Sequence, residues 1–154
     1  MSIDVDGNDY WIFEAIECVS PRIVIIEYNS LFGKDLKISV PYDENFARAE
    51  KHFSGLYYGA SISALADLAE KKGYCLVGSN TAGCNLFFVK KEFVGNIKTF
   101  SPQEAYIGSK FRQSRDENGN LTFLNHCDGL KLIQDMEVVN VADNKKVKIS
   151  SLNI

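Results

Sequence analysis

The first thirty residues constrain the fold more than any other part of this chain of 154 residues. Residues 23–26 form an uninterrupted apolar run, Ile-Val-Ile-Ile, which is typical of a strand covered on both faces. Residues 9–19 before it repeat apolar side chains at helical spacing, and Pro21 ends that helix because a proline disfavours helical geometry in the preceding residue. A short apolar segment at residues 2–6 precedes the helix. The segment therefore predicts a β-α-β unit with parallel strands.

Carboxylates follow both of these strands. Asp4 and Asp6 lie at the end of the first strand, and Glu27 directly follows the second. Ligands of open parallel sheets bind outside the carboxyl ends of the strands, so we expect the three acids at one edge of the sheet. Acids on a buried-type strand are costly unless a partner satisfies them. The pattern therefore predicts a general base or a divalent-metal ligand among them.

Other roles remain open for these polar residues. Asn29, together with Glu27 and Asp6, offers an oxygen-rich set suited to a hard cation such as Mg²⁺. Alternatively, Glu27 pairs with a lysine and Asn29 begins a turn. The acids near the first strand can also cap the following helix and interact with its dipole, and for Asp9 we expect this structural role.

Downstream, the sequence predicts a helix, two further strands and a terminal hairpin. The helix begins at Ser61 and ends at Gly73, and the two strands after it are separated by a short turn, which predicts an antiparallel hairpin. Residues 30–60 form a long irregular connection. We expect strands near residues 2–6, 22–29, 74–80 and 85–91, with the last between the second and third and antiparallel to both, and a small hairpin within residues 138–149.

Composition excludes several classes of protein. The net charge of −3 disfavours nucleic-acid binding, which needs a basic stripe. No apolar run reaches the roughly 18 residues of a membrane span, and no secretory signal is recognisable. The four cysteines show no close pairs, which predicts reduced thiols in a cytoplasmic protein, with Cys18 and Cys75 in the core.

One short motif resembles another enzyme class. Asp4-Val-Asp6-Gly7 is similar to the start of haloacid-dehalogenase-type phosphatases, and residues 72–80 imitate their second motif, a strand that ends in Ser or Thr. That resemblance implies Asp4 as nucleophile and Asp6 as acid. The next residues, Asn8 and Asp9, depart from the pattern of that family.

Several segments in order resemble a second family, the FkbM-like S-adenosylmethionine-dependent methyltransferases. The similar segments are residues 2–12, 21–30, 40–43, 57–61, 72–74 and 85–89. The resemblance implies an α/β fold with a partial Rossmann-like methyltransferase sheet, mostly parallel with one antiparallel C-terminal strand, and helices on both faces. Residues 1–93 would be the C-terminal half of that domain, and residues 94–154 an extension packed on it.

The resemblance also implies a reaction and a set of site residues. Many relatives methylate a hydroxyl of a sugar or polysaccharide precursor with S-adenosylmethionine as donor. Carried onto this chain, the catalytic residues would be Asp4, Asp6 and Glu27, the cofactor-binding residues Asp4 and Gly7, and the substrate-binding residues Asn29, Tyr57, Tyr58 and Ser61. A divalent metal would bind Asp6, Glu27 and Asn29.

The first three strands of that family have no counterpart here, including the strands that hold the cofactor. We therefore expect a truncated domain with an incomplete cofactor site. The strand at residues 2–6 would expose an unpaired edge, and such edges recruit other chains. This supports an alternative function, a non-catalytic module that pairs through that edge with a second copy or with a separate N-terminal half.

Overall fold

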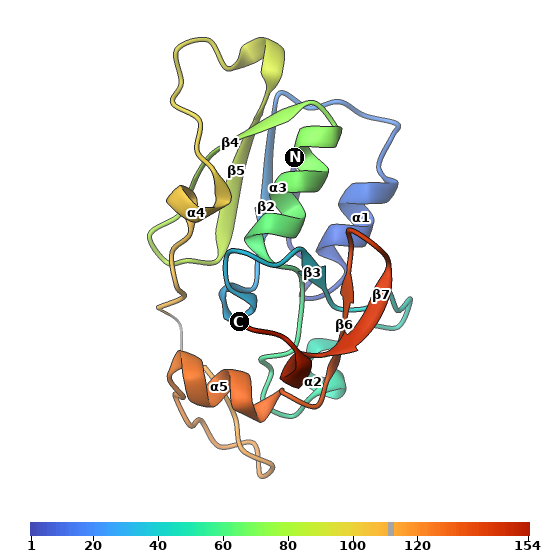
Figure 1. Ribbon diagram of the computed structural model, residues 1–154, viewed down its shortest axis with the longest axis vertical. Helices are drawn as coiled ribbons and strands as arrows, with labels where there is room; N and C mark the ends of the chain where they lie inside the picture. Colours follow the sequence, from blue (N-terminus) through green and yellow to red (C-terminus); the bar gives the residue numbers. More distant parts are fainter. Residues whose placement is uncertain (111–112) are drawn as a thin grey trace.

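Two small sheets organise the computed structural model, which describes residues 1–110 and 113–154 (Figure 1). The first sheet contains β1 (Ser2–Ile3), β2 (Ile23–Glu27), β4 (Tyr74–Ser79) and β5 (Asn85–Lys90). The second contains β3 (Ile38–Ser39), β6 (Glu137–Asn140) and β7 (Lys145–Lys148). The helices are α1 (Asp9–Ala15), α2 (Arg48–Lys51), α3 (Ile62–Lys71), α4 (Pro102–Ala105) and α5 (His126–Leu132).

The first sheet has the strand order β1-β2-β5-β4, so the predicted position of the fourth strand is confirmed. The predicted fold class is wrong, however. Only β1 and β2 pair in parallel, whereas β5 is antiparallel to both β2 and β4, and the second sheet is antiparallel throughout. The sheet is therefore mixed, not a mostly parallel Rossmann-like sheet. The mostly parallel class was an implication of the family resemblance, and among the described strands only the β1–β2 pair is parallel because β5 lies between β2 and β4 as predicted.

The turn between β4 and β5 is held by Asn80. Its side-chain oxygen accepts hydrogen bonds from the backbone amides of Gly83, Cys84 and Asn85, at 3.0, 3.0 and 3.1 Å. An asparagine that satisfies successive amides in this way closes a tight reversal of the chain. This local chemistry confirms the predicted antiparallel hairpin.

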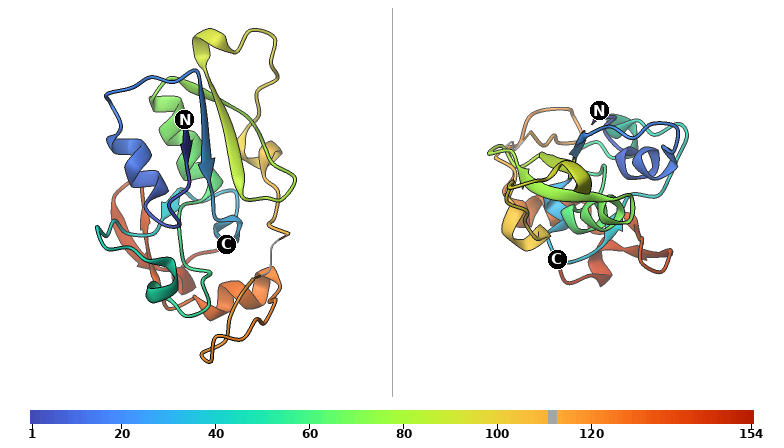
Figure 2. Two further views of the ribbon diagram at one scale, coloured as in Figure 1. Left: turned by 180° about the vertical axis from the view of Figure 1, so that it is seen from behind. Right: turned by 90° about the horizontal axis from the view of Figure 1, so that it is seen from above.

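Helices cover only one face of the first sheet, contrary to the expectation of helices on both. The first core lies between that face and α1 and α3, and its fully buried members include Val24, Ile26 and Phe88. Seen from behind in Figure 2, the opposite face carries none of the described helices. On that face Ile23 is 53% exposed. The apolar run at residues 23–26 is thus covered on one side and open on the other.

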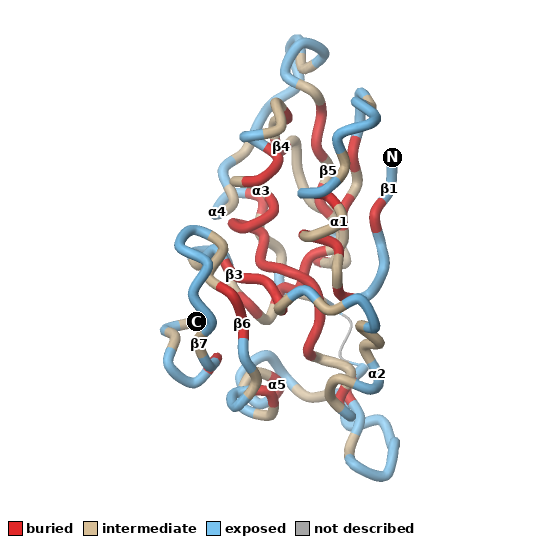
Figure 3. The backbone as a smooth tube through the Cα atoms, turned by 90° about the vertical axis from the view of Figure 1, so that its right-hand side faces the viewer, coloured by how far each residue is buried: buried red, intermediate tan, exposed pale blue. Residues whose placement is uncertain are grey.

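The second sheet joins distant parts of the chain. The predicted terminal hairpin forms as β6 and β7, and β3, which lies inside the connection at residues 30–60, pairs with β6. A second core fills this region, with Phe32, Ile38 and Val138 among its buried members. Figure 3 shows buried stretches along α3, β4, β5 and β6. Residues 94–154 therefore contact the earlier part of the chain through a shared sheet.

The structure shows where the four cysteines lie and how long the helices are. All four cysteines are free, and Cys18, expected in the core, is exposed because it follows the end of α1 in the loop before β2. Cys75 is half-buried. None of the described helices is long and apolar enough to cross a membrane.

Candidate functional site

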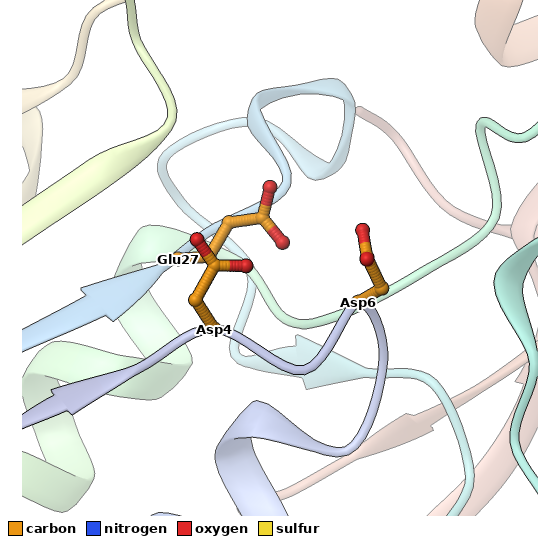
Figure 4. Close-up of side chains that lie close together, drawn as sticks. All are labelled: Asp4, Asp6 and Glu27. Carbon is orange, nitrogen blue, oxygen red and sulfur yellow. The ribbon is translucent and has the colours of Figure 1, made fainter.

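The parallel pairing of β1 and β2 brings the predicted acids together. Ile3 is the register partner of Ile26, so Asp4 leaves β1 beside the end of β2, where Glu27 lies. One carboxylate oxygen from each of Asp4, Asp6 and Glu27 lies within 4.8 Å of the other two. Figure 4 shows the three side chains around one space at the end of the two strands. The predicted convergence of these acids is confirmed, and their chemical role remains a prediction.

Asp9 holds the turn that presents Asp4 and Asp6. The Asp9 side chain is 0% exposed, and its two oxygens accept hydrogen bonds from the amides of Val5 and Gly7, both at 3.0 Å. Asp6 has a φ of 56°, a left-handed conformation that costs energy in a residue with a side chain. The two hydrogen bonds offset that cost and fix the turn. Asp9 thus has a structural role, but it holds the turn before α1 and does not cap the helix as predicted, because the cap position is Asn8.

Glu27 lies in an unusual environment. Its Oε2 atom is buried and meets no hydrogen-bond partner within the described chain. Burial raises the pKa of Glu27 from 4.5 to about 8, while Arg48 lowers it and Asp4, Asp9 and Asp6 raise it further. The side chain therefore carries a proton over most of the neutral range. The alternative ion pair between Glu27 and a lysine does not form among the residues described.

Arg48 supplies the positive charge of the site, and sequence reasoning missed it. From the first residue of α2, its Nη1 donates to Asp6 Oδ1 at 2.7 Å and its Nε donates to the carbonyl of Gly55 at 2.6 Å. Its guanidinium carbon lies 3.6 Å from the centre of the Tyr58 ring, an arrangement that favours a cation over an aromatic face. A lone arginine in a helix of four residues leaves no pattern in the sequence by which this contact could have been found.

A cavity of about 500 Å³ opens beside Glu27. Residues from both halves of the chain line it, including Glu27, Asn29, Arg48, Tyr58, Cys84 and His126. Tyr58 is 8% exposed, and burial followed by the Glu27 charge raises the pKa of its hydroxyl. His126, the first residue of α5, also lies in the wall of the cavity. Of the four predicted substrate-binding residues, the structure thus places Asn29 and Tyr58 at this cavity.

The remaining predicted substrate residues have structural contacts elsewhere. The hydroxyl of Tyr57 donates to the carbonyl of Glu137 in the second sheet. Ser61 is fully buried, and its hydroxyl donates to the carbonyl of Leu36 at 2.6 Å and accepts from the amide of Ala64 at 3.2 Å, which caps α3. Both side chains connect elements of the fold, and neither lines the cavity.

Asn29 lines the cavity but is also engaged with the backbone. Its amide nitrogen donates to the carbonyls of Leu56 and Tyr58, at 2.9 and 3.0 Å, and its oxygen accepts from the amide of Leu31 at 3.0 Å. These bonds leave its oxygen directed at the turn after β2, in accordance with the alternative in which Asn29 begins a turn. The acids Asp4, Asp6 and Glu27 form the oxygen cluster without it.

Gly7 does not fit the cofactor role that the family resemblance implies. A Cβ atom at this position would lie 2.1 Å from Cδ1 of Phe46, so the ring of Phe46 covers the glycine. Its amide already donates to Asp9. The absence of a side chain here serves the packing of Phe46 on the turn and leaves no space for S-adenosylmethionine at Gly7.

The phosphatase motif meets a comparable difficulty. Ser79, the residue that imitates the second motif, donates its hydroxyl to the carbonyl of Ala105. Ser79 lies on β4, which is separated from β1 by β2 and β5. This hydroxyl therefore anchors α4 to the sheet.

The comparisons with known proteins do not extend this description. No family model, no curated protein and no solved structure matches the chain. Membership in the methyltransferase family therefore remains a prediction from the sequence.

Proposed function

We propose that this chain forms the acceptor side of a hydroxyl-directed methyltransferase, in which Glu27 accepts the proton of a hydroxyl on a small saccharide-like molecule. The reaction class comes from the sequence resemblance, and the acceptor side comes from the cavity. Because the ring of Phe46 covers Gly7, the proposal assigns residues of this chain to the acceptor only, and the transfer assay also tests whether the chain binds the methyl donor.

The observation that carries the proposal is the buried Oε2 atom of Glu27, which has no partner among the described residues beside a cavity of about 500 Å³. A buried polar atom without a hydrogen bond costs about 1–3 kcal/mol. A hydroxyl group bound in the cavity would supply the missing partner. Ligand pockets for small molecules occupy roughly 300–1,000 Å³, so the space suits a molecule of this class.

The electrostatics of Glu27 suit a general base. A base works best when its pKa lies near the working pH, and burial raises the pKa of Glu27 to about 8. Arg48 limits that rise, and the neighbouring aspartates add to it. The deprotonated Glu27 carboxylate would accept the proton of a hydroxyl bound in the cavity, which would make the hydroxyl oxygen a better nucleophile. The reaction is therefore expected to accelerate with pH up to about 8.

The test is transfer of a labelled methyl group. The purified chain is incubated with methyl-labelled S-adenosylmethionine and with the methyl glycosides of glucose, galactose, mannose and rhamnose, from about pH 6 to about pH 9. Labelled saccharide is expected from the native chain, and Glu27→Gln should reduce its rate by about 10²–10⁴-fold, the usual contribution of a general base. Asp43→Asn, an acid outside the cavity lining, is the matched control. A folded native chain that labels none of the acceptors contradicts the proposal.

A further inference from the structure

We propose that the cavity beside Glu27 takes a saccharide that carries an oxyanion, a carboxylate or a phosphate, and that Arg48 binds this anionic group. The inference rests on the proposed function and deepens it, because it names the chemical class of the acceptor. It depends on two properties of the residues that line the cavity, which are their charges and their unused hydrogen-bond donors.

The charged side chains in the cavity lining are cationic at neutral pH. Arg48 and Lys110 line the cavity, whereas none of the described aspartates does. Glu27 is the one acid among the described lining residues, and burial raises its pKa to about 8, so it is mostly uncharged at neutral pH. Partial burial lowers the pKa of His126, whose imidazole is then neutral as well. The cavity is therefore positive, although the chain carries a net charge of −3.

Arg48 is held in place and still has donors to offer. Its Nε donates to the carbonyl of Gly55, and its guanidinium lies over the ring of Tyr58, so the side chain is oriented before any ligand binds. Its Nη1 donates to Asp6 in an exposed ion pair. A guanidinium carries more N–H groups than these contacts use, so the others can donate to a ligand. Its planar fork of N–H groups matches the oxygens of a carboxylate or a phosphate.

Tyr58 supplies a second donor in the same wall. The residue is only 8% exposed, and its hydroxyl meets no hydrogen-bond partner within the described part of the chain. A buried tyrosine hydroxyl usually has a partner. Burial and the Glu27 charge raise the pKa of this hydroxyl, so it keeps its proton and can donate it in a hydrogen bond. An oxygen of a bound ligand would supply the missing acceptor.

These features disfavour other occupants. A cation would be repelled by Arg48 and Lys110. A neutral saccharide can bond to Glu27 and Tyr58 through its hydroxyls, but it gives Arg48 no charged partner inside the cavity, so it should bind more weakly. The volume of about 500 Å³ accommodates a monosaccharide together with an anionic group.

The experiment compares three ligands on the native chain by isothermal titration calorimetry at neutral pH and low salt. They are the methyl glycoside of glucuronic acid, glucose 6-phosphate and the methyl glycoside of glucose. The two methyl glycosides differ only where a carboxylate replaces a CH₂OH group. At least one acidic sugar should bind about tenfold tighter than the neutral glycoside, the effect of one charge-assisted hydrogen bond. The tighter of the two acidic sugars identifies the group that is recognised. If neither binds more tightly than the neutral glycoside, the inference is overturned.

Substitutions test whether Arg48 is responsible. Arg48→Met should abolish the preference for the acidic sugar and change the affinity for the neutral glycoside by less than about twofold, since only the charged contact is lost. Tyr58→Phe should weaken both kinds of sugar by about threefold, because a neutral hydrogen bond is lost. Arg22→Met, whose arginine lies over Phe93 and outside the cavity lining, is the matched control. Circular dichroism verifies that each variant is folded. A preference that persists in Arg48→Met, or that disappears in Arg22→Met, overturns the inference.

Binding and methyl transfer are separate readouts. If an acidic sugar binds with this preference but receives no labelled methyl group, the proposed function is contradicted and the inference stands. If neutral glycosides are methylated and acidic sugars are not preferred, the inference alone is overturned.

Discussion

Two acids near the end of β2 differ in how the fold treats them. Asp9 is 0% exposed, and both of its oxygens accept a backbone hydrogen bond. Glu27 is less buried as a whole, yet its Oε2 is buried without a partner in the described structure. In both cases burial raises the pKa. The difference shows that burial alone does not mark a functional acid, whereas an unsatisfied atom beside a cavity is a stronger indication.

The largest expected effect concerns the structural acid. Asp9→Ala leaves the amides of Val5 and Gly7 without acceptors and removes two charge-assisted hydrogen bonds, so the free energy of unfolding should fall by about 3 kcal/mol. Urea denaturation measures it. Glu14→Ala, an exposed acid on the same helix, should change stability by less than about 0.5 kcal/mol. An equal loss of stability in the two variants would contradict the structural role of Asp9.

An intermediate effect is expected at Glu27, and it depends on pH. Its pKa is about 8 in the folded state and 4.5 as the ordinary value, so the folded chain holds more protons than the unfolded chain between these limits. Stability attributable to this group therefore decreases as the pH rises from 4.5 to about 8. At pH 8, Glu27→Gln should stabilise the fold by about 2 kcal/mol, which is less than the full shift because the side chain is not wholly buried. Denaturation curves at several pH values test the sign: the native chain should lose stability relative to Glu27→Gln as the pH rises, and a difference between the two chains that does not change with pH would contradict it.

The smallest effect on stability is expected at Arg48, which forms an ion pair with Asp6 and lowers the pKa of Glu27. Arg48→Met removes the ion pair to Asp6 and the cation–ring contact with Tyr58, which together should cost about 1 kcal/mol of stability because the ion pair is exposed. Because Arg48 lowers the pKa of Glu27, that pKa should rise in the variant. Carbon-detected NMR titration of the Glu27 carboxyl measures the shift. Arg22→Met, whose arginine lies over Phe93, is the matched control and should leave the Glu27 pKa unchanged.

Local chemistry predicted the strands and their order, but not the fold class. The β-α-β unit, the Asn80 turn and the terminal hairpin depend on neighbouring residues, and sequence patterns report these well. The apolar run at residues 23–26 predicted helices on both faces of the strand. An apolar run does not specify what packs on each face, and here the described helices cover only one face. The insertion of β5 between β2 and β4 then made most pairings antiparallel.

The candidate site shows a similar division. The convergence of Asp4, Asp6 and Glu27 followed from parallel strands that end at one edge. Arg48 and His126 could not be predicted, because each reaches the cavity from a short helix whose position depends on tertiary packing. Gly7 was assigned to a cofactor by the family resemblance, whereas here the ring of Phe46 covers this glycine.

Because β3 pairs with β6, the second sheet can form only after most of the chain has been synthesised. Ile38 meets Asn140 and Ser39 meets Val139, so about a hundred residues must leave the ribosome before β3 gains its only strand-length partner in the described sheets. Until then Ile38 and Val40, which are buried in the finished molecule, lack the C-terminal part of their core. The first sheet, whose last strand ends at Lys90, can form earlier. Until β6 has been synthesised, the apolar side chains around β3 therefore lack part of the cover that they have in the finished molecule, and exposed apolar surface of this kind favours aggregation.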